Sequence, residues 1–207
     1  MGVKDRKARE FKRREDDILS TAFQLLTEME PAQMTMELIA EKAEIGRGTI
    51  YKHFKSKDEI YARLILNRRE RFIKSLQQID EEEIGRIPRL MRCYMDYCLE
   101  DKQAYGVHKR CDSHCIRENL SAEILEALQK QQRDKTELVK SILVKAMGKE
   151  IENSDELLHY TCAAWGMQRG AIDAFLENRF EGTVLDEEKY FKIVEQMFLG
   201  GMPVIFQ

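Results

Sequence analysis

The sequence is poor in residues that interrupt helices and in patterns that form strands. It holds three prolines and eleven glycines in 207 residues, and alternating runs of β-branched residues are scarce. Few prolines leave long stretches in which a helix can continue unbroken. Apolar residues instead recur with a helical period, so we expect an all-α protein of about nine helices.

Other absences exclude whole classes of protein. No segment approaches the roughly 18 consecutive apolar residues that cross a bilayer, and no apolar stretch follows the basic N-terminus as in a secretory signal. The five cysteines form no CxxC pair, and glycine-rich phosphate loops, HExxH and GxSxG are missing. We therefore expect a cytoplasmic chain with reduced thiols, no membrane partner, no catalytic residues and no cofactor.

Charge is distributed unevenly along the chain. Residues 1–74 hold 17 Lys and Arg against 13 Asp and Glu, whereas the remaining residues hold 17 against 24. Such an asymmetry suits a protein that presents one end to a polyanion, although ordinary scatter in composition gives differences of this size too.

The first residues read as a basic arm ahead of a helix over about 11–29, and the first eight or so are expected to be mobile. Within residues 4–14 only Asp5 and Glu10 are acidic, and the cations are Lys4, Arg6, Lys7, Arg9, Lys12, Arg13 and Arg14. The arm either reaches the backbone or minor groove of DNA or is a solvated tail.

Residues 35–54 have the layout of a helix-turn-helix. Thr35 is a good N-cap for a short helix, which a turn of about three residues separates from a second short helix. In that second helix Ile50 and Phe54, four residues apart, point inward. Its outward residues are small or cationic, which suits the major groove; they are Gly48, Thr49 and Lys52, with Tyr51 and His53 on the flanks.

Two runs within this segment are more specific. They are Ile39-Ala40-Glu41-Lys42-Ala43 and Arg47-Gly48-Thr49-Ile50-Tyr51-Lys52-His53-Phe54-Lys55-Ser56-Lys57-Asp58-Glu59-Ile60. Over about residues 15–65 the chain resembles the tetracycline-repressor (TetR) family. It departs from the family pattern at Glu44, where the family usually has Gly, and at Gly46, where the family usually has Ser as the helix cap. A left-handed conformation at Glu44 would cost about 1 kcal/mol relative to Gly.

The resemblance implies a set of DNA contacts. Arg47 would make a bidentate contact with a guanine edge, and Gly48 and Thr49 would lie against bases or the sugar-phosphate wall. Contacts to phosphates would come from Tyr51, Lys52, His53, Thr35 and Lys57. Packing of the Tyr51 ring and plain surface charge at Lys57 are the alternatives.

The resemblance also implies two domains and a homodimer. Residues 1–56 would form the DNA-binding domain, and a helix over 57–79 would link it to a ligand-sensing and dimerisation domain over 57–207. The last two long helices, expected at about 155–178 and 186–200, would pair with their mates in a four-helix bundle. A monomer that buries both faces internally is the alternative.

Caps and prolines predict the other helix boundaries. Ser56 and Glu59 form a capping box ahead of the linking helix. Pro88 stands where a helix begins, and 102–117 is expected to be helical. The last three helices are expected to open at Ser121, Ser154 and Asp186.

A ligand pocket lies among the middle helices in the TetR family. Residues that would line an apolar pocket here are Met91, Tyr94, Met95, Tyr105, Trp165 and Phe175, with core packing as the alternative. His108, Cys111 and Cys115 fall on one helix face, which a metal or redox sensor would need. Their spacing matches no standard zinc pattern, so we expect no metal site.

Together these features predict a DNA-binding repressor. It would bind a palindromic double-stranded operator as a homodimer and be released by an unidentified small apolar ligand. The alternative is a DNA-bound protein of the same fold that acts through a protein partner without small-molecule induction.

Overall fold

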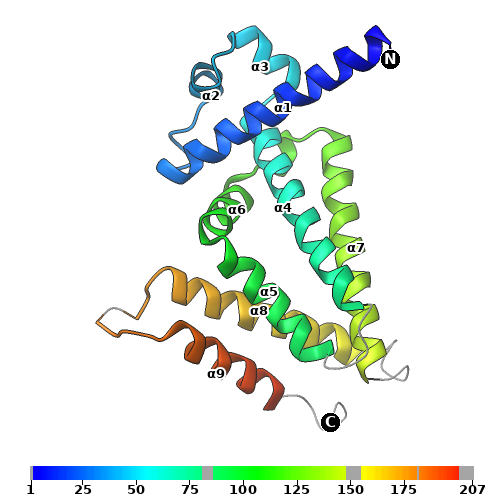
Figure 1. Cartoon of the computed structure of the whole chain (residues 1–207), viewed down its shortest axis with the longest axis vertical. Coiled ribbons are helices and arrows are strands. Elements are labelled where there is room, and N and C mark those ends of the chain that lie inside the picture. The colour runs from blue at the N-terminus through cyan, green and yellow to red at the C-terminus, as the bar shows by residue number, and fades with distance from the viewer. Residues whose placement is uncertain (1, 81–85, 148–154, 181, 201–207) are drawn as a thin grey trace. The chain divides into compact units, whose positions relative to one another are not determined.

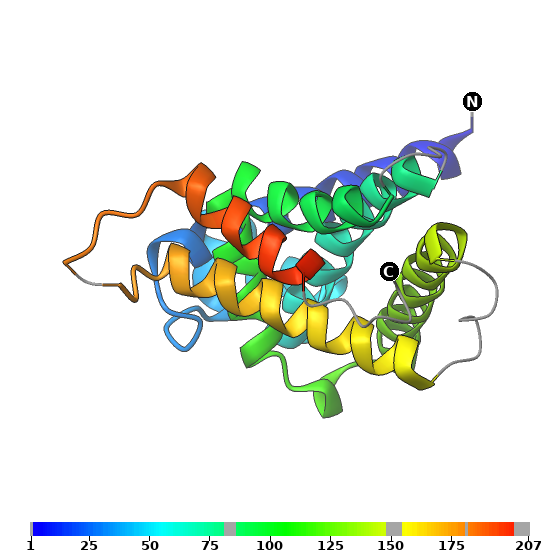
Figure 2. The same cartoon turned by 90° about the horizontal axis from the view of Figure 1, so that it is seen from below.

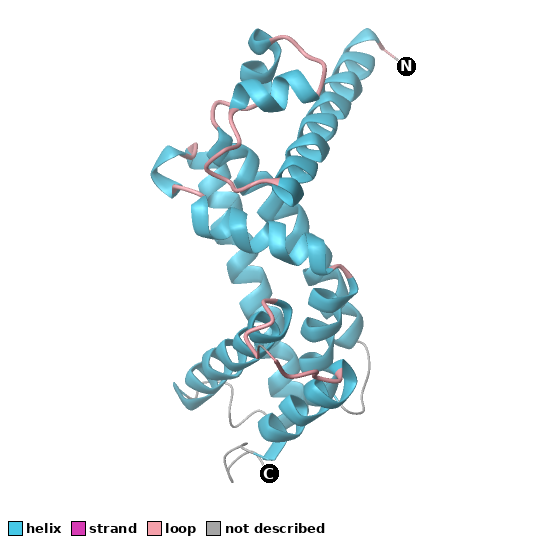
Figure 3. Cartoon of the chain, turned by 90° about the vertical axis from the view of Figure 1, so that its left-hand side faces the viewer, coloured by secondary structure: helices cyan, strands magenta, loops and turns pink. Residues whose placement is uncertain are grey.

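A computed structural model describes residues 2–80, 86–147, 155–180 and 182–200 of the chain. Within these ranges the protein has nine α-helices, one short 3-10 helix and no strand (Figure 1 and Figure 3), which confirms the all-α prediction. The elements are α1 Val3–Glu28, α2 Met36–Lys42, α3 Arg47–His53, α4 Lys57–Asp80, α5 Arg86–Glu100, α6 Lys102–His114, η1 Arg117–Asn119, α7 Ala122–Met147, α8 Asp155–Leu176 and α9 Glu187–Gly200.

The basic N-terminal segment is helical, so the expectation of a mobile arm before a helix at residue 11 is wrong. α1 begins at Val3 and continues without interruption to Glu28. Lys, Arg, Ala and Glu are strong helix formers, and they dominate this segment. At its start the N–H of Gly2 donates to the Asp5 carboxylate at 3.1 Å. Asp5 lies in the first turn, where the helix dipole favours an acidic group.

The chain divides into two compact units. The first consists of Met1–Glu70 with Gln103–Gln132, and the second of Arg71–Lys102 with Arg133–Gln207. The division does not follow the expected functional boundary after residue 56, because the first turns of α4, most of α6 and the start of α7 pack with the N-terminal helices. The assignment of DNA binding to 1–56 and of sensing and dimerisation to 57–207 stays a prediction.

The first unit has a closed apolar core. Five side chains from α1, α2 and α3 are fully buried in it, namely Ile18, Ala22, Leu26, Ile39 and Ile50. Tyr61 of α4 and Cys111 of α6 are equally buried and belong to the same cluster. Burial of an aliphatic side chain of this size contributes about 1.5–3 kcal/mol, so the core suffices to hold these helices together.

Polar groups attach α4, α6 and the loop after α6 to each other within this unit. The buried Asp58 carboxylate accepts hydrogen bonds from the Ile116 N–H at 2.9 Å and from the Asn119 amide at 2.8 Å. The Arg110 guanidinium on α6 donates to the Leu26 carbonyl near the end of α1. Because the last carbonyls of a helix have no partner inside it, Arg110 satisfies one that would otherwise need water.

The second unit is organised by contacts of α5 with α8 and α9 and of α8 with α9. Figure 2 shows α8 and α9 running side by side. The buried Gln168 amide of α8 donates to the Met91 carbonyl of α5 at 3.0 Å. A smaller core of Leu76, Ile79 and Ile142 joins α4 to α7 within this unit.

Most predicted boundaries agree with the structure to within a few residues. Ser121 and Asp186 accept hydrogen bonds from backbone N–H groups three residues on, and so cap α7 and α9 as predicted. Pro88 lies in the first turn of α5. Ser154 lies outside the described residues. Among the helices that the structure describes, none is long and apolar enough to cross a membrane.

Candidate nucleic-acid interface

The recognition helix α3 is short and anchored from one side. Gly46 caps it in an extended conformation without a side-chain hydrogen bond, as the sequence predicts. Ile50 is fully buried and Phe54, its C-cap, is 2% exposed. Both therefore face the core, which confirms the predicted orientation of the helix and directs its other face to solvent.

The solvent face of α3 carries the residues that the sequence proposes for DNA. Arg47, Gly48, Tyr51 and Lys52 are exposed, whereas Thr49 and His53 are half-buried. Tyr51 is 48% exposed, so packing of its ring into the core does not explain it. The face therefore offers a guanidinium, an ammonium, a phenol and a bare backbone position within seven residues.

The turn before α3 adopts the conformation that a glycine would favour. Glu44 has φ 53°, one of two positive-φ residues other than glycine among those described. Its N–H donates to the Glu41 carbonyl at 3.1 Å, and the next N–H, of Ile45, donates to the Ala40 carbonyl at 2.9 Å. These bonds fix the turn and offset part of the cost of the left-handed conformation, which is about 1 kcal/mol.

Gly48 has open space where a side chain would begin. A Cβ built at this position meets no protein atom within 4 Å. The protein itself therefore does not require glycine here, and a helix interior would be more stable with Ala by roughly 0.5–1 kcal/mol. A requirement for glycine must come from something that approaches the helix from outside.

Two predicted phosphate contacts lie at helix N-termini. The exposed Thr35 hydroxyl accepts a hydrogen bond from the Leu38 N–H at 3.1 Å and thus caps α2. The Lys57 ammonium, in the first turn of α4, donates to the Pro31 carbonyl at 3.3 Å. Its three N–H groups leave donors for a phosphate as well, so both roles are compatible.

The capping box predicted for α4 is formed in part. The Ser56 hydroxyl accepts from the Glu59 N–H at 3.3 Å. The Glu59 carboxylate, however, accepts from the Lys55 N–H at 2.8 Å rather than from the cap residue. These two hydrogen bonds fix the first turn of α4, which follows the recognition helix closely in the sequence.

A contact that the sequence reasoning missed joins α1 to the recognition helix. The rings of Phe11 and His53 lie with centroids 4.0 Å apart and planes inclined by 34°. Burial lowers the pKa of His53, an effect that Arg14 and Lys52 reinforce and Glu15 opposes. Neutral imidazole is therefore favoured in the free protein. Phe11 stands at the start of the helix expected from the sequence, but no local spacing rule predicts its contact with a residue 42 positions further along the chain.

The cysteine-containing face of α6 has the properties of core packing. Cys111 is fully buried, and burial raises its pKa to about 12. Burial likewise raises the pKa of Cys115 to about 11, and its thiol donates to the Asp58 carbonyl with sulfur 3.6 Å from oxygen. Thiols held protonated in this way are poor nucleophiles and metal ligands. Among the described residues no group of three or more His, Cys, Asp or Glu could hold a metal ion.

The residues proposed for a ligand pocket are distributed over the two units. Tyr105 is buried in the first unit, and the other five belong to the second. Met91 and Met95 are buried. The rings of Tyr94 and the exposed Trp165 are arranged edge to face, with their centroids 6.3 Å apart. Burial raises the pKa of Tyr94.

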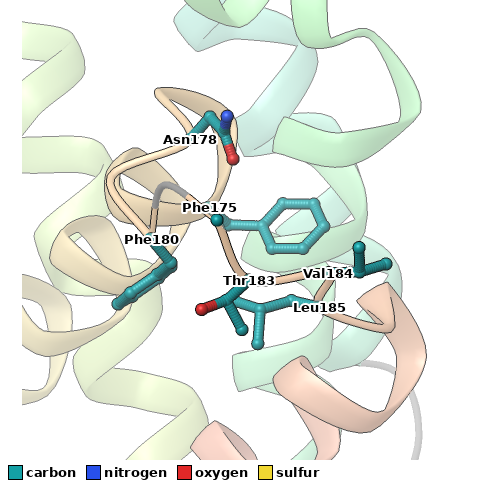
Figure 4. Close-up of a pocket in the computed structure, with 7 residues that line it drawn as sticks. Phe175, Asn178, Phe180, Thr183, Val184 and Leu185 are labelled. Atoms are coloured by element: carbon teal, nitrogen blue, oxygen red, sulfur yellow. The ribbon is translucent and has the colours of Figure 1, made fainter.

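Two of these residues line hollows in the second unit. Met95 belongs to a hollow of about 400 Å³ between α5 and α9, together with Arg92, Asp96, Leu99, Glu187, Glu188, Phe191, Lys192 and Glu195. Phe175 lines another, of about 480 Å³, at the loop that joins α8 to α9. Figure 4 shows Val184 and Leu185 on the side of the Phe175 ring, whereas the Phe180 ring points away from it.

α8 and α9 expose large apolar side chains. On α8 they are Leu158, Trp165 and Met167, and on α9 Ile193 and Met197. In the sequence Gly166 lies between Trp165 and Met167, and Gly170 lies three residues after Met167; a Cβ built on either glycine meets no atom within 4 Å. Leu158 and Trp165, seven residues apart, share one side of α8, whereas Met167 lies on the opposite side.

The exposed helix α3, held on the core that α1, α2 and α3 share, has the arrangement of a helix-turn-helix. Residues 18–64 match the family described as bacterial regulatory proteins, tetR family. The matched segment includes both runs that carry the sequence resemblance. The search of curated proteins found no matching relative.

Solved structures extend the likeness over nearly the whole chain. SmeT in complex with triclosan matches with a TM-score of 0.66 and 18% identity, covering 94% of this chain and 95% of that one. The TetR-family regulator PfmR from Thermus thermophilus gives 0.65 and 19%, covering 90% and 98%. The fatty acid degradation regulator FadR from Bacillus halodurans gives 0.65 and 19%, covering 91% and 99%. These likenesses show the fold of the full chain.

Proposed function

We propose that this TetR-family regulator binds a palindromic DNA operator through α3. The observation that carries the proposal is the solvent face of α3, where Arg47 stands at the N-terminal end of the helix beside the open backbone at Gly48. Arg47 would read a guanine edge, with Thr49 beside it. Phosphates would be held by Tyr51, Lys52, His53, Thr35 and Lys57, which fix register and carry no sequence information directly.

The proposed active form is a homodimer paired through α8 and α9. A single recognition helix reads too few bases for useful specificity, and a two-fold dimer reads two half-sites about 34–36 Å apart. The exposed apolar residues of α8 and α9, with the small residues Gly166 and Gly170 among them, support this pairing because a second copy would remove them from water.

The proposed action is repression relieved by a small apolar ligand. Occupancy of an operator is enough to block polymerase, whereas activation needs a further contact. The hollow at Met95, with Leu99 and Phe191 in its lining, has the size of a small-molecule site. Its carboxylates and cations would orient a polar end. SmeT, whose fold this chain shares, was solved in complex with the small molecule triclosan.

The first experiment measures binding of labelled genomic fragments, starting with the gene's own upstream region. We expect a palindromic site to be bound well above the non-specific level of about 10⁻⁴–10⁻⁶ M. Arg47→Ala should cost about 1–3 kcal/mol and relax specificity at one base pair per half-site. Sequence-independent binding that Arg47→Ala leaves unchanged would contradict the proposal. Release of a bound operator by a protein partner from lysate, and by no small molecule, would favour regulation through that partner.

Gly48→Ala separates a DNA role from a folding role. The free protein has room for the methyl group, so we expect unchanged or slightly higher stability together with weaker operator binding. Gly106→Ala on α6 is the matched control, because a Cβ there also meets nothing within 4 Å. It should raise stability similarly and leave binding unchanged. Equal binding by the two variants would remove Gly48 from the interface.

The dimer is tested by sedimentation of Gly166→Leu. Gly166 is exposed and a Cβ built on it meets no atom within 4 Å, whereas a leucine side chain would separate two paired α8 helices. We expect a monomer of unchanged helical content that has lost operator affinity. Gly106→Leu would be the control for an equally bulky substitution elsewhere. A dimer unaffected by Gly166→Leu would exclude α8 as the pairing face.

A further inference from the structure

The N-terminal third of α1 is a helix with almost nothing packed against it. Every residue from Lys4 to Arg13 is exposed, although the helix is unbroken from Val3. The match to the TetR family begins only at residue 18. Residues 3–14, which we call the basic extension, therefore lie outside the segment that defines the family fold.

The cations of the basic extension are sorted by face. Positions 4, 7, 11 and 14 are separated by three or four residues and so share one side of an α-helix. Lys4, Lys7 and Arg14 lie on this side together with Phe11. Arg6 and Arg13 point more than a right angle away from it, at 100° per residue.

The contact between Phe11 and His53 determines which side faces the recognition helix. Their ring centroids are 4.0 Å apart, and the charge of Arg14 acts on His53. The side that carries Lys4, Lys7 and Arg14 is thus the side on which α3 lies. DNA held against the outer face of α3 would meet these cations before those at Arg6 and Arg13.

We propose that the basic extension is a second DNA-binding element, in which Lys4, Lys7 and Arg14 bind phosphates beside the site read by α3. The proposal rests on the proposed DNA binding by the helix-turn-helix. Because the extension is helical and held by Phe11, its cations are already positioned, and binding does not have to order a flexible arm. Contacts of this kind add affinity for any sequence and steepen the salt dependence.

The test compares two double variants of the full-length protein. One variant is Lys7→Gln/Arg14→Gln and the other is Arg6→Gln/Arg13→Gln. Both remove two positive charges seven residues apart, but they do so on different sides of the helix, because the positions differ by one residue. Binding to a short duplex of random sequence is followed by fluorescence anisotropy over a range of KCl. Random sequence serves because phosphate contacts need no operator, and circular dichroism checks that both variants keep their helical content.

Each lost phosphate contact reduces the magnitude of the slope of log affinity against log salt by about 0.9. Because Lys7→Gln/Arg14→Gln removes two cations, we expect this slope to fall in magnitude by about 2 for each DNA-binding domain bound. Arg6→Gln/Arg13→Gln should change it by less than half as much. Equal slopes for the two variants, or no change in either, would overturn the proposal. Failure of the proposed operator function would give a different result. The two double variants would still differ in salt slope as expected, but the protein would prefer no DNA sequence and Arg47→Ala would have no effect.

Discussion

The two compact units differ in where they leave apolar side chains in water. In the first unit the large exposed apolar residues are Phe11, Tyr51 and Ile116, and the first two lie at the recognition helix. Among the described residues of the second unit there are seven, carried by α8, α9 and the loop between them: Leu158, Trp165, Met167, Phe180, Val184, Ile193 and Met197. The first unit buries its apolar side chains more completely and presents cations, whereas the second leaves apolar side chains of α8 and α9 in water.

The difference is consistent with the two roles proposed above, DNA binding by the first unit and pairing through the second. A closed core keeps α3 at a fixed orientation, which DNA reading requires. The proposed pairing through α8 and α9 would cover the apolar side chains that these helices expose, and contiguous exposed patches mark interaction sites in soluble proteins. Substitutions in the core of the first unit are expected to lower subunit stability, whereas substitutions at the exposed apolar residues of the second unit are expected to weaken dimerisation.

The largest effect on stability is expected from Phe54→Ala. Phe54 is 2% exposed in the core of the first unit, and removal of a buried aromatic ring costs about 3–5 kcal/mol. Urea unfolding followed by circular dichroism measures the loss. Leu158→Ala is the counterpart in the second unit. Leu158 is 57% exposed, so its truncation should weaken dimerisation far more than subunit stability. Similar losses of subunit stability in both variants would contradict the contrast.

A smaller loss is expected from Asp58→Ala. This substitution removes the hydrogen bonds that the Ile116 N–H and the Asn119 amide donate to a buried carboxylate, and a hydrogen bond to a charged group contributes about 1.5–3 kcal/mol. Asn119→Ala is the control that keeps the backbone bond and should cost less. Hydrogen exchange should show faster opening of the loop after α6 in Asp58→Ala. Unchanged protection of Ile116 would mean that the carboxylate does not fix this loop.

Glu44→Gly is expected to stabilise the protein slightly. Glu44 has φ 53°, and glycine adopts that conformation at about 1 kcal/mol less cost. Part of this gain is offset because glycine gains more freedom in the unfolded chain. The midpoint of thermal unfolding should rise by a few degrees, by the usual conversion for domains of this size. A lower midpoint would show that the Glu44 side chain makes a stabilising contact.

The smallest effect is a pH dependence at His53. Burial lowers its pKa below 6.5 in the folded state, so the unfolded chain binds a proton more readily. Stability from this group is therefore present above about pH 6.5 and is lost as the pH falls through the folded pKa. His53→Gln should reduce the difference in urea midpoint between neutral and mildly acidic solution. An unchanged difference would assign the acid sensitivity to other groups.

Local signals in the sequence were enough for the elements and for the recognition helix. The side chains of Thr35, Ser121 and Asp186 cap their helices by accepting hydrogen bonds from backbone N–H groups three residues further on, which is a short-range interaction that spacing predicts. The inward direction of Ile50 and Phe54 also follows from helical period alone. The resemblance to the TetR family rests on the same stretch, because bases impose similar demands on every recognition helix.

Contacts between distant residues were beyond this reasoning. Asp58 bonds to groups 58 and 61 positions further along the chain, and no spacing rule connects them. The extent of α1 was underestimated because a charged segment reads as solvated whether it is helical or not. Tyr105 was grouped with Met91 and Phe175 by composition, although the fold assigns it to the other unit.

The sequence by itself determined the all-α class, the helix-turn-helix and the face of α3 that meets solvent, because each depends on caps and periodicity within about twenty residues. Only the tertiary structure decided that α6 belongs with the N-terminal helices, that Phe11 lies on His53, and that α8 and α9 keep apolar side chains exposed. Helix packing brings together residues far apart in the chain, and burial in the folded state is a property of the neighbours rather than of the residue.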